Sequence, residues 1–167
     1  MNVLIISDTH GWKDQLLQVI ERHKNEVDAI IHCGDSELPV DAKELEGVLT
    51  VQGNCDIAPF PEEIIQEING KVFYITHGHY YNVKHSLMNL MYRSEEVGAD
   101  IVCFGHSHVF TSERSNDKLF INPGSLKNPR LVTTGTYAIY TLHDDRSEEV
   151  TYYDLQGNVM KEWSKTF

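Results

Sequence analysis

Residues 1–11 read Met-Asn-Val-Leu-Ile-Ile-Ser-Asp-Thr-His-Gly. Four apolar residues in a row, three of them β-branched, predict a strand that is buried on both faces, as in the interior of a parallel sheet. Gly11 then allows the chain to turn. Because ligands of open α/β folds bind just beyond the carboxyl ends of such strands, we expect Asp8 and His10 to lie in a functional site.

A similar arrangement, an apolar run that ends at a glycine-containing turn with a polar side chain, recurs along the chain. The runs and the polar residues that follow them are 28–33 with Asp35, 47–52 with Asn54, 71–76 with His77, and 100–104 with His106 and His108. Strands that end in this way place their polar residues at one edge of a sheet. We therefore expect all of these side chains to meet.

The remaining pattern completes an α/β architecture. We expect helices over 12–25 and 83–97, a short helical stretch over 40–45, and a hairpin of strands 63–68 and 71–76 that turns at Asn69-Gly70. From Val109 onward the pattern predicts antiparallel strands over 109–114, 118–122, 136–142 and 149–155, and a last short strand that ends near Trp163. No linker or repeat interrupts the chain, so we expect one domain over residues 1–167, with two packed sheets and helices outside.

Composition limits the classes of function. The formal net charge is -11 and no basic cluster is present, which argues against a long nucleic acid as partner. Met1 leads directly into the first strand, so we expect neither a secretory signal nor a membrane span, and we expect a cytoplasmic protein. Cys33, Cys55 and Cys103 show no Cys-x-x-Cys pattern, and each is expected to be a small buried residue.

The candidate ligands offer only oxygen and nitrogen donors. They are Asp8, His10, Asp35, Asn54, His77, His106 and His108. Seven ligands are too many for one ion, but with one bridging carboxylate they divide into four and four. Two divalent ions about 3.5 to 4 Å apart form the kind of site that hydrolyses phosphate esters. Asp35 is the natural bridge, and His106 and His108 can each face a different ion.

The ordered set Asp-x-His, Gly-Asp, Gly-Asn, His and Gly-His-x-His resembles the calcineurin-like metallophosphoesterase superfamily. Gly-Asn-Cys-Asp from Gly53, Thr-His-Gly-His from Thr76 and Asn-Pro-Gly-Ser from Asn122 resemble its small single-domain bacterial and archaeal phosphodiesterases. The resemblance implies a four-layer α/β/β/α sandwich of two mixed sheets. It also implies one metal held by Asp8, His10, Asp35 and His108, and a second held by Asp35, Asn54, His77 and His106.

The function that follows from this resemblance is hydrolysis of small phosphodiesters by a hydroxide that bridges the two ions. Manganese is the expected metal, and nickel, zinc or iron also suit a set of imidazoles and carboxylates. Asp35 and Asn54 are expected to serve catalysis as well as metal binding. The physiological substrate, the native metal and the oligomeric state stay open, a homo-oligomer included.

One position departs from the superfamily pattern. Many members carry His after the Asn, where it resembles a general acid for the leaving group, and here that residue is Cys55. A thiol cannot imitate an imidazolium, so a proton must come from His79, from water, or from neither. Asp56 would then lack an imidazole to orient. We expect better turnover of activated diesters than of alkyl monoesters.

Other interpretations apply to single residues and to the whole chain. His23, His32, His85 and His143 are expected to be surface or hydrogen-bonded residues, Arg130 a surface residue, and the roles of Trp12, Tyr80 and Tyr81 stay open. A non-catalytic scaffold of the same fold is the alternative function, although such a scaffold need not retain all seven ligand positions. An amidohydrolase built on His77 and His79 is excluded by length, because that barrel needs about 250 residues.

Overall fold

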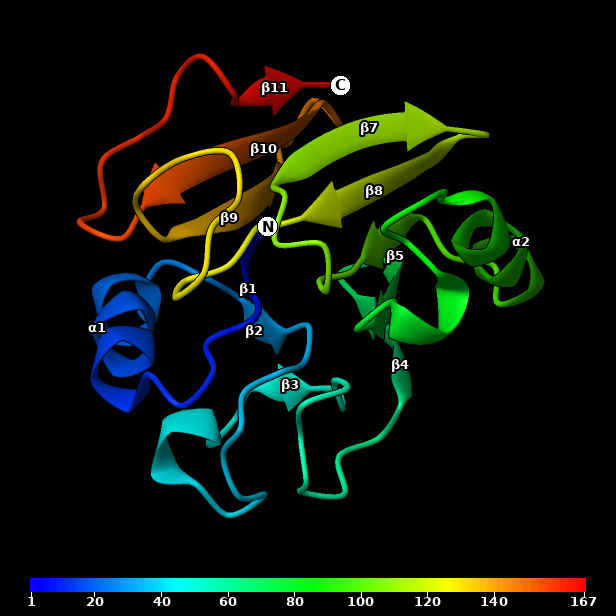
Figure 1. Ribbon diagram of the computed structural model, residues 1–167. Helices are drawn as coiled ribbons and strands as arrows, with labels where there is room; N and C mark the ends of the chain where they lie inside the picture. The colour runs from blue at the N-terminus through cyan, green and yellow to red at the C-terminus, as the bar shows by residue number, and fades with distance from the viewer.

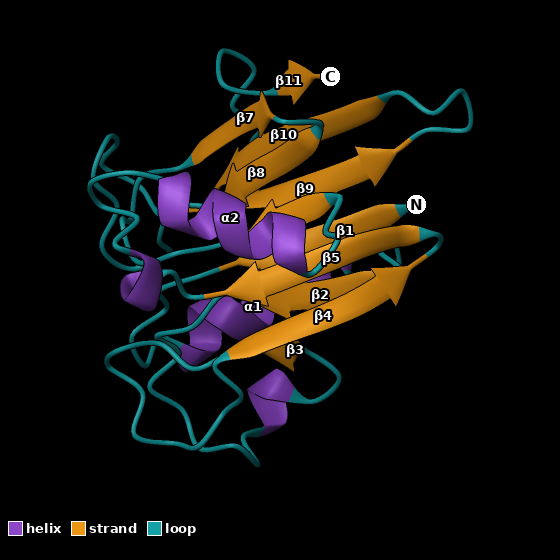
Figure 2. Cartoon of the chain, turned by 90° about the vertical axis from the view of Figure 1, so that its right-hand side faces the viewer, coloured by secondary structure: helices purple, strands orange, loops and turns teal.

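The computed structural model describes all 167 residues, which form two β-sheets packed face to face with one helix on each outer side (Figure 1 and Figure 2). The helices are α1 (Lys13–His23) and α2 (Met88–Glu96), and the short 3₁₀ helices are η1 (Lys43–Leu45) and η2 (His79–Tyr81). The strands are β1 (Asn2–Ile6), β2 (Ala29–His32), β3 (Leu49–Thr50), β4 (Glu63–Ile68), β5 (Lys71–Thr76), β6 (Ile101–Cys103), β7 (Thr111–Ser115), β8 (Lys118–Asn122), β9 (Thr136–Leu142), β10 (Glu148–Asp154) and β11 (Lys165–Thr166).

Both sheets are mixed. The first has the order β11-β10-β9-β1-β2-β3, in which β1, β2 and β3 run parallel. The second has the order β4-β5-β6-β8-β7, in which β5, β6 and β8 run parallel. Each sheet therefore contains a parallel centre with antiparallel strands beside it, and the expected four-layer α/β/β/α sandwich is confirmed.

Strand β1 explains why the layers stack as they do. Val3 and Ile5 belong to the cluster of buried side chains between the two sheets, whereas Leu4 and Ile6 belong to the cluster under α1. Alternate residues of a strand point to opposite faces, so an uninterrupted apolar run is buried on both. The prediction that β1 is buried on both faces is confirmed, since all four side chains are fully buried.

The β4–β5 hairpin turns at Asn69-Gly70 as predicted. Both residues have positive φ, 47° and 79°, which a tight hairpin turn of the favoured handedness requires. Asn116 and Asp117, which also have positive φ, connect β7 to β8 in the same way.

Several predicted elements are wrong in their limits, among them the strand over 47–52, of which only Leu49–Thr50 forms a strand. Helix α2 begins at Met88 rather than at residue 83, because Asn82 adopts a left-handed conformation and the Ser86 hydroxyl accepts a hydrogen bond from the Met88 N–H (3.1 Å). The last strand lies at Lys165–Thr166, beyond its expected end, and Val159 makes only an isolated bridge to Tyr153. The stretch expected to be helical over 40–45 is a single 3₁₀ turn.

The parallel centres of the two sheets determine where polar side chains gather. The carboxyl ends of β1, β2 and β3 lie side by side in the first sheet, and those of β5 and β6 lie side by side in the second. The residues that follow these ends meet across the interface, as the hydrogen bond from the His106 N–H to Asp8 Oδ2 (3.2 Å) shows. No helix in the structure has the length and apolar character that crossing a bilayer requires.

Candidate metal centre

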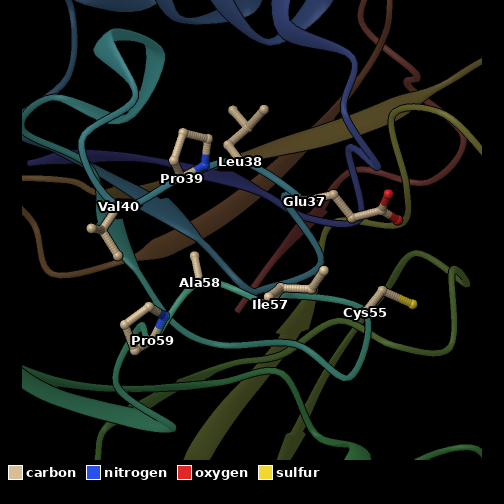
Figure 3. A pocket seen from close by; sticks show the side chains of 8 residues that line it. All are labelled: Glu37, Leu38, Pro39, Val40, Cys55, Ile57, Ala58 and Pro59. Atoms are coloured by element: carbon tan, nitrogen blue, oxygen red, sulfur yellow. The ribbon is translucent and has the colours of Figure 1, made fainter.

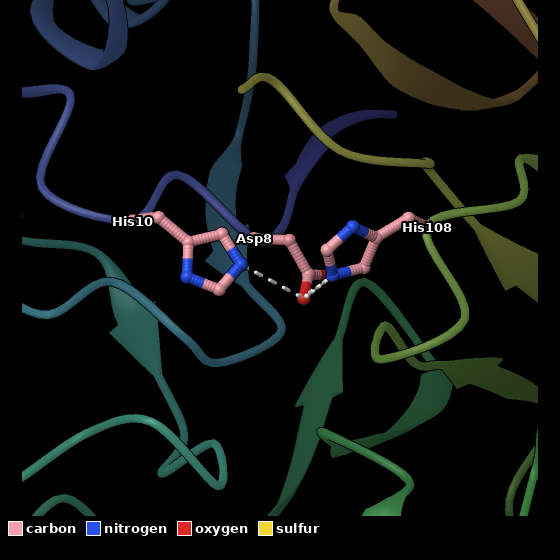
Figure 4. Close-up of side chains that lie close together, drawn as sticks. All are labelled: Asp8, His10 and His108. Atoms are coloured by element: carbon pink, nitrogen blue, oxygen red, sulfur yellow. Dashed lines mark ion pairs between the residues drawn. The ribbon is translucent and has the colours of Figure 1, made fainter. Parts of the chain in front are cut away.

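Asp8, His10 and His108 converge from the β1 end and the β6 end (Figure 4). His108 Nε2 lies 3.0 Å from Asp8 Oδ1, and His10 Nε2 lies 3.9 Å from the same oxygen. The two imidazole rings are 5.4 Å apart between centroids. One carboxylate oxygen therefore lies between two imidazole nitrogens, which is an arrangement of donor atoms that a divalent cation can occupy.

Asp35 connects this group to the second sheet. Its Oδ2 lies 3.9 Å from His10 Nε2 and 3.4 Å from His77 Nε2. The ligand atoms of Asp8, Asp35 and His77 all lie within 4.8 Å of one another. Among the candidate ligands, Asp35 therefore has the central position that a bridging carboxylate needs.

Asn54 and His106 complete the set on the far side of Asp35. Asn54 Oδ1 lies 3.1 Å from His77 Nε2, and the His77 and His106 rings are 5.1 Å apart between centroids. The structure thus brings all seven predicted residues to one place, although they come from five strand ends.

Three of the imidazoles are oriented through their outer nitrogens. His77 Nδ1 donates to the Cys33 carbonyl (2.7 Å), and His108 Nδ1 donates to the Asn128 carbonyl (2.9 Å). His10 Nδ1 lies 2.6 Å from the Glu37 carboxylate. With the proton held on Nδ1, the Nε2 lone pair of each ring faces the carboxylates, as in histidines that ligate metals.

The carboxylates of Asp8 and Asp35 are also held through one oxygen each, which accepts hydrogen bonds from neighbouring groups. Asp8 Oδ2 accepts hydrogen bonds from the Ser7 hydroxyl (2.5 Å) and the His106 N–H, and Asp35 Oδ1 accepts one from the Cys55 N–H (2.7 Å). Asp8 Oδ1 and His10 Nε2 are buried and have no hydrogen-bond partner. Lone pairs that face one another without a donor are costly when buried, and a cation between them removes that cost. The residues present therefore fit a divalent metal.

The pKa shifts of the imidazoles and of Asp35 agree with a cation-binding site. Burial disfavours protonation of His77, but the carboxylates of Asp35 and Asp8 outweigh burial and raise its pKa. The contact with Asp8 also raises the pKa of His108. Burial raises the pKa of Asp35 and the contact with His77 lowers it, with a net shift downward. The carboxylates therefore favour positive charge at this place, which a bound divalent cation would supply.

The backbone of the site is strained. Asp8, His10 and Asp35 have φ of 53°, 42° and 54°, and His106 and His108 have φ of 65° and 59°. Such left-handed conformations are uncommon for residues other than glycine and concentrate at functional sites, where the surrounding structure holds them.

The glycines of the motifs allow the loops to approach closely. A Cβ on Gly53 would lie 2.0 Å from Asp35 Oδ1, and a Cβ on Gly105 would lie 2.1 Å from Ser7 Oγ and 2.7 Å from Asp8 Oδ2. Only glycine permits these distances, so these two motif glycines are required by packing against the candidate ligands.

Asp56 has a role that the sequence did not reveal. Its carboxylate accepts hydrogen bonds from the N–H groups of Asp35 (2.8 Å), Glu37 (2.6 Å) and Gly53 (2.8 Å), and from the Ser36 hydroxyl (3.2 Å). It therefore ties the loop after β2 to the loop after β3 and holds the Asp35 backbone in place. The Asp in Gly-Asn-Cys-Asp is the available signal in the sequence, but the motif alone predicts only that Asp56 lacks an imidazole to orient.

The contact of Glu37 with His10 was also not predicted from the sequence, although Glu37 directly follows Gly-Asp-Ser.

The Asn-Pro-Gly-Ser motif lies beneath the site. Asn122 Nδ2 donates to the Gly105 carbonyl (2.9 Å), and the Ser125 hydroxyl donates to the Asp8 carbonyl (2.8 Å). Asn-Pro-Gly-Ser thus supports the loops that carry Asp8 and His106.

Cys55 and His79 lie at the border of the site. Cys33 and Cys103 are buried as expected, but the expectation that Cys55 is buried is wrong, because its turn lies beyond the edge of the sheet. Partial desolvation by its neighbours and the nearby Asp35 raise the pKa of the Cys55 thiol to about 11. The His79 ring lies 5.3 Å from that of His77 and 6.1 Å from that of His106. His79 is thus next to the candidate ligands and not among them.

The other residues considered from the sequence lie away from the candidate ligands or at their margin. His32 accepts the Gly34 N–H and contacts the Thr9 hydroxyl, and His23 contacts the Tyr137 hydroxyl. Arg130 is exposed and borders, with His108, Lys127 and others, a polar hollow of about 590 Å³.

A family model for the calcineurin-like phosphoesterase superfamily domain matches residues 1–145. The chain belongs to this superfamily. "Probable metallophosphoesterase YsnB" of Bacillus subtilis is 47% identical over 163 residues, covering 97% of this chain and 96% of the relative. "Phosphodiesterase MJ0936" of Methanocaldococcus jannaschii is 30% identical over 145 residues, covering 74% of this chain and 83% of the relative. A crystal structure of a predicted phosphoesterase from Streptococcus pneumoniae has a TM-score of 0.94 at 33% identity, covering 99% of this chain and 96% of that one.

Membership supports a metallophosphoesterase, a hydrolase of phosphate esters, and the clustered carboxylates and imidazoles fit a divalent metal. The resemblance seen in the sequence is confirmed.

Proposed function

We propose that this protein hydrolyses small phosphodiesters at a pair of divalent metal ions. In this proposal one ion is held by Asp8, His10, Asp35 and His108, and the other by Asp35, Asn54, His77 and His106. Manganese is the first choice, because imidazole, amide and carboxylate ligands suit it, with nickel, zinc or iron as substitutes.

The observation that carries the proposal is the orientation of the donor atoms. Three imidazoles have their outer nitrogens bonded to acceptors and present their inner nitrogens to carboxylate oxygens. Asp35 Oδ2 lies between two of these nitrogens, at 3.9 Å from His10 and 3.4 Å from His77. His10 and His77 belong to different groups of clustered ligand atoms, and Asp35 occurs with each of them, which supports two ions rather than one.

When bound, divalent ions supply an activated water nucleophile and neutralise the charge on the phosphate. The residues of this chain orient the reactants. Asp35 and Asn54 border the position of the phosphate, and His79 is the imidazole available to hydrogen-bond to a leaving oxygen. Burial and the neighbouring His77 lower the pKa of His79, so it is a neutral donor near pH 7. Leaving groups that depart without full protonation are therefore favoured.

Preference for diesters has two supports. Cys55 stands where many superfamily members have a His, and its raised pKa of about 11 leaves a weakly acidic thiol there. In addition, one relative bears the name phosphodiesterase.

We also propose that residues 1–167 form one domain, because both sheets contribute side chains to the buried cluster between them. We propose that this domain acts in the cytoplasm, because its cysteines are free and form no disulfide.

The test uses the full chain after chelation and reconstitution with manganese, nickel or zinc. Initial rates on bis(p-nitrophenyl) phosphate and p-nitrophenyl phosphate are compared, and metal stoichiometry is measured by calorimetry. Diester cleavage that requires two metal equivalents and exceeds monoester cleavage supports the proposal. Metal binding without cleavage of either ester would favour the alternative, a non-catalytic scaffold.

A further inference from the structure

An apolar pocket of about 570 Å³ opens directly beside the candidate metal centre (Figure 3). Residues 37–40 form one side and residues 55–59 form the opposite side. Its lining is apolar except at one end, where Glu37 and Cys55 lie. The apolar lining residues are Leu38, Pro39, Val40, Ile57, Ala58 and Pro59.

The polar end of the pocket is continuous with the metal centre. Glu37 Oε1 lies 2.6 Å from His10 Nδ1, and the Cys55 N–H donates to Asp35 Oδ1. The Cys55 sulfur lies within 4.8 Å of ligand atoms of both His10 and Asp35. A substituent on a phosphate bound at Asp35 can therefore reach the pocket past Cys55.

Hydrogen bonds and prolines restrain the two sides of the pocket. Asp56 accepts the N–H of Glu37, and the Gln52 side chain donates to the Ala58 carbonyl (3.1 Å). Pro39 and Pro59 restrict the backbone further. A pocket formed in advance loses little conformational entropy when it binds a ligand.

Two apolar side chains at this pocket are exposed to water. The Ile57 side chain is 98% exposed, more than any other large apolar side chain of the protein, and that of Val40 is 55% exposed. Covering such side chains with an apolar group is favourable in proportion to the area removed from water. The Glu37 carboxylate at the mouth disfavours a second anionic group.

We propose that this pocket binds one ester substituent of the substrate, and that this substituent is an uncharged aromatic ring. The inference rests on the proposed function, because it places the phosphate at the metal centre. At about 570 Å³ the pocket has room for a single ring or a fused pair, and it lies within the usual range of small-molecule pockets, about 300 to 1,000 Å³. The substrate is thus a phosphodiester with at least one aryl or heteroaryl group.

The test measures binding rather than turnover. Phenylphosphonate and methylphosphonate are titrated into the metal-loaded protein by calorimetry, and the methyl signals of Ile57, Ala58 and Val40 are followed by NMR. We expect phenylphosphonate to bind about tenfold more tightly. Only the phenyl compound should shift the three methyl signals.

Ile57→Ser and Val40→Ser test the lining, because both side chains are exposed and the substitutions should spare the fold. Each should reduce the phenyl preference to about threefold or less. Ile65→Ser is the matched control, because Ile65 is 50% exposed on β4 and is not among the pocket residues. It should leave the preference unchanged.

Equal binding of the two phosphonates, or a phenyl preference that survives both variants, would overturn the inference. So would a concentration-dependent dimer that Ile57→Ser dissociates, since the pocket would then be an interface between copies. Phenyl-selective binding without any diester cleavage would leave the pocket assignment standing and overturn the proposed function, so the two failures are distinguishable.

Discussion

The carboxylate of Glu37 lies 2.6 Å from Nδ1 of His10, and it reaches that ring from the loop after β2, whereas His10 follows β1. The contact holds the Nδ1 proton outward and leaves Nε2 free at the metal centre, 3.9 Å from both Asp8 Oδ1 and Asp35 Oδ2. A carboxylate in this position makes the imidazole a stronger ligand.

Replacement of Glu37 should therefore weaken metal binding. We expect Glu37→Ala to reduce affinity for manganese about tenfold, and Glu37→Gln to have an intermediate effect because it retains an acceptor without the charge. Competition calorimetry measures both. Glu46→Gln, at an exposed position, is the control, and equal affinities for all three variants would show that Glu37 does not orient His10.

Asp35→Asn and His106→Ala should abolish most activity without unfolding the protein. The hydrogen bond of His106 to Asp8 uses the backbone N–H, which alanine retains, and Asn is close to Asp in size, so the effect on folding should be small. We expect kcat on an activated diester to fall by about 100-fold or more. Circular dichroism and thermal unfolding verify the fold, and loss of structure in both variants would argue that these residues serve stability.

Asp56→Ala should destabilise the protein and disturb the metal centre together. The substitution leaves three backbone N–H groups and one hydroxyl without their acceptor, in a region that is mostly buried. We expect the free energy of unfolding in urea to fall by about 3 kcal/mol. Asp41→Ala, at an exposed position, should change it little. Unaltered stability of the Asp56 variant would contradict the assigned role.

Stability of the metal-free protein should depend on pH through His32. Full burial lowers its pKa from 6.5 to about 4, so between these values the unfolded chain binds a proton that the folded chain does not. Stability therefore decreases as pH falls from 6.5 towards 4, by about 3 kcal/mol in total. The difference in unfolding free energy between wild type and His32→Gln, measured across this range, isolates the effect. A difference independent of pH would rule it out.

Much of the fold and the ligand set was predictable from local sequence. The apolar run of Val3 to Ile6 predicted a strand buried on both faces, and Asn69-Gly70 predicted its hairpin, because each pattern depends on neighbouring residues alone. The convergence of the seven candidate ligands was also predictable, since parallel strands align their carboxyl ends. The start of α2 was not, because the left-handed turn at Asn82 interrupts a periodic apolar pattern.

The positions of most strands along the chain, the two packed sheets and the set of candidate ligands were therefore predictable from the sequence itself, through periodicity and the spacing of polar residues after apolar runs, whereas the order of the strands within each sheet came from the tertiary structure. Only the tertiary structure decided which groups support those ligands. Glu37 orients His10 and Asp56 joins two loops across intervals of 27 and 19 to 21 residues, and the apolar pocket forms between segments 37–40 and 55–59. Such contacts depend on how loops from different strands approach one another in space, and this cannot be predicted from local sequence patterns.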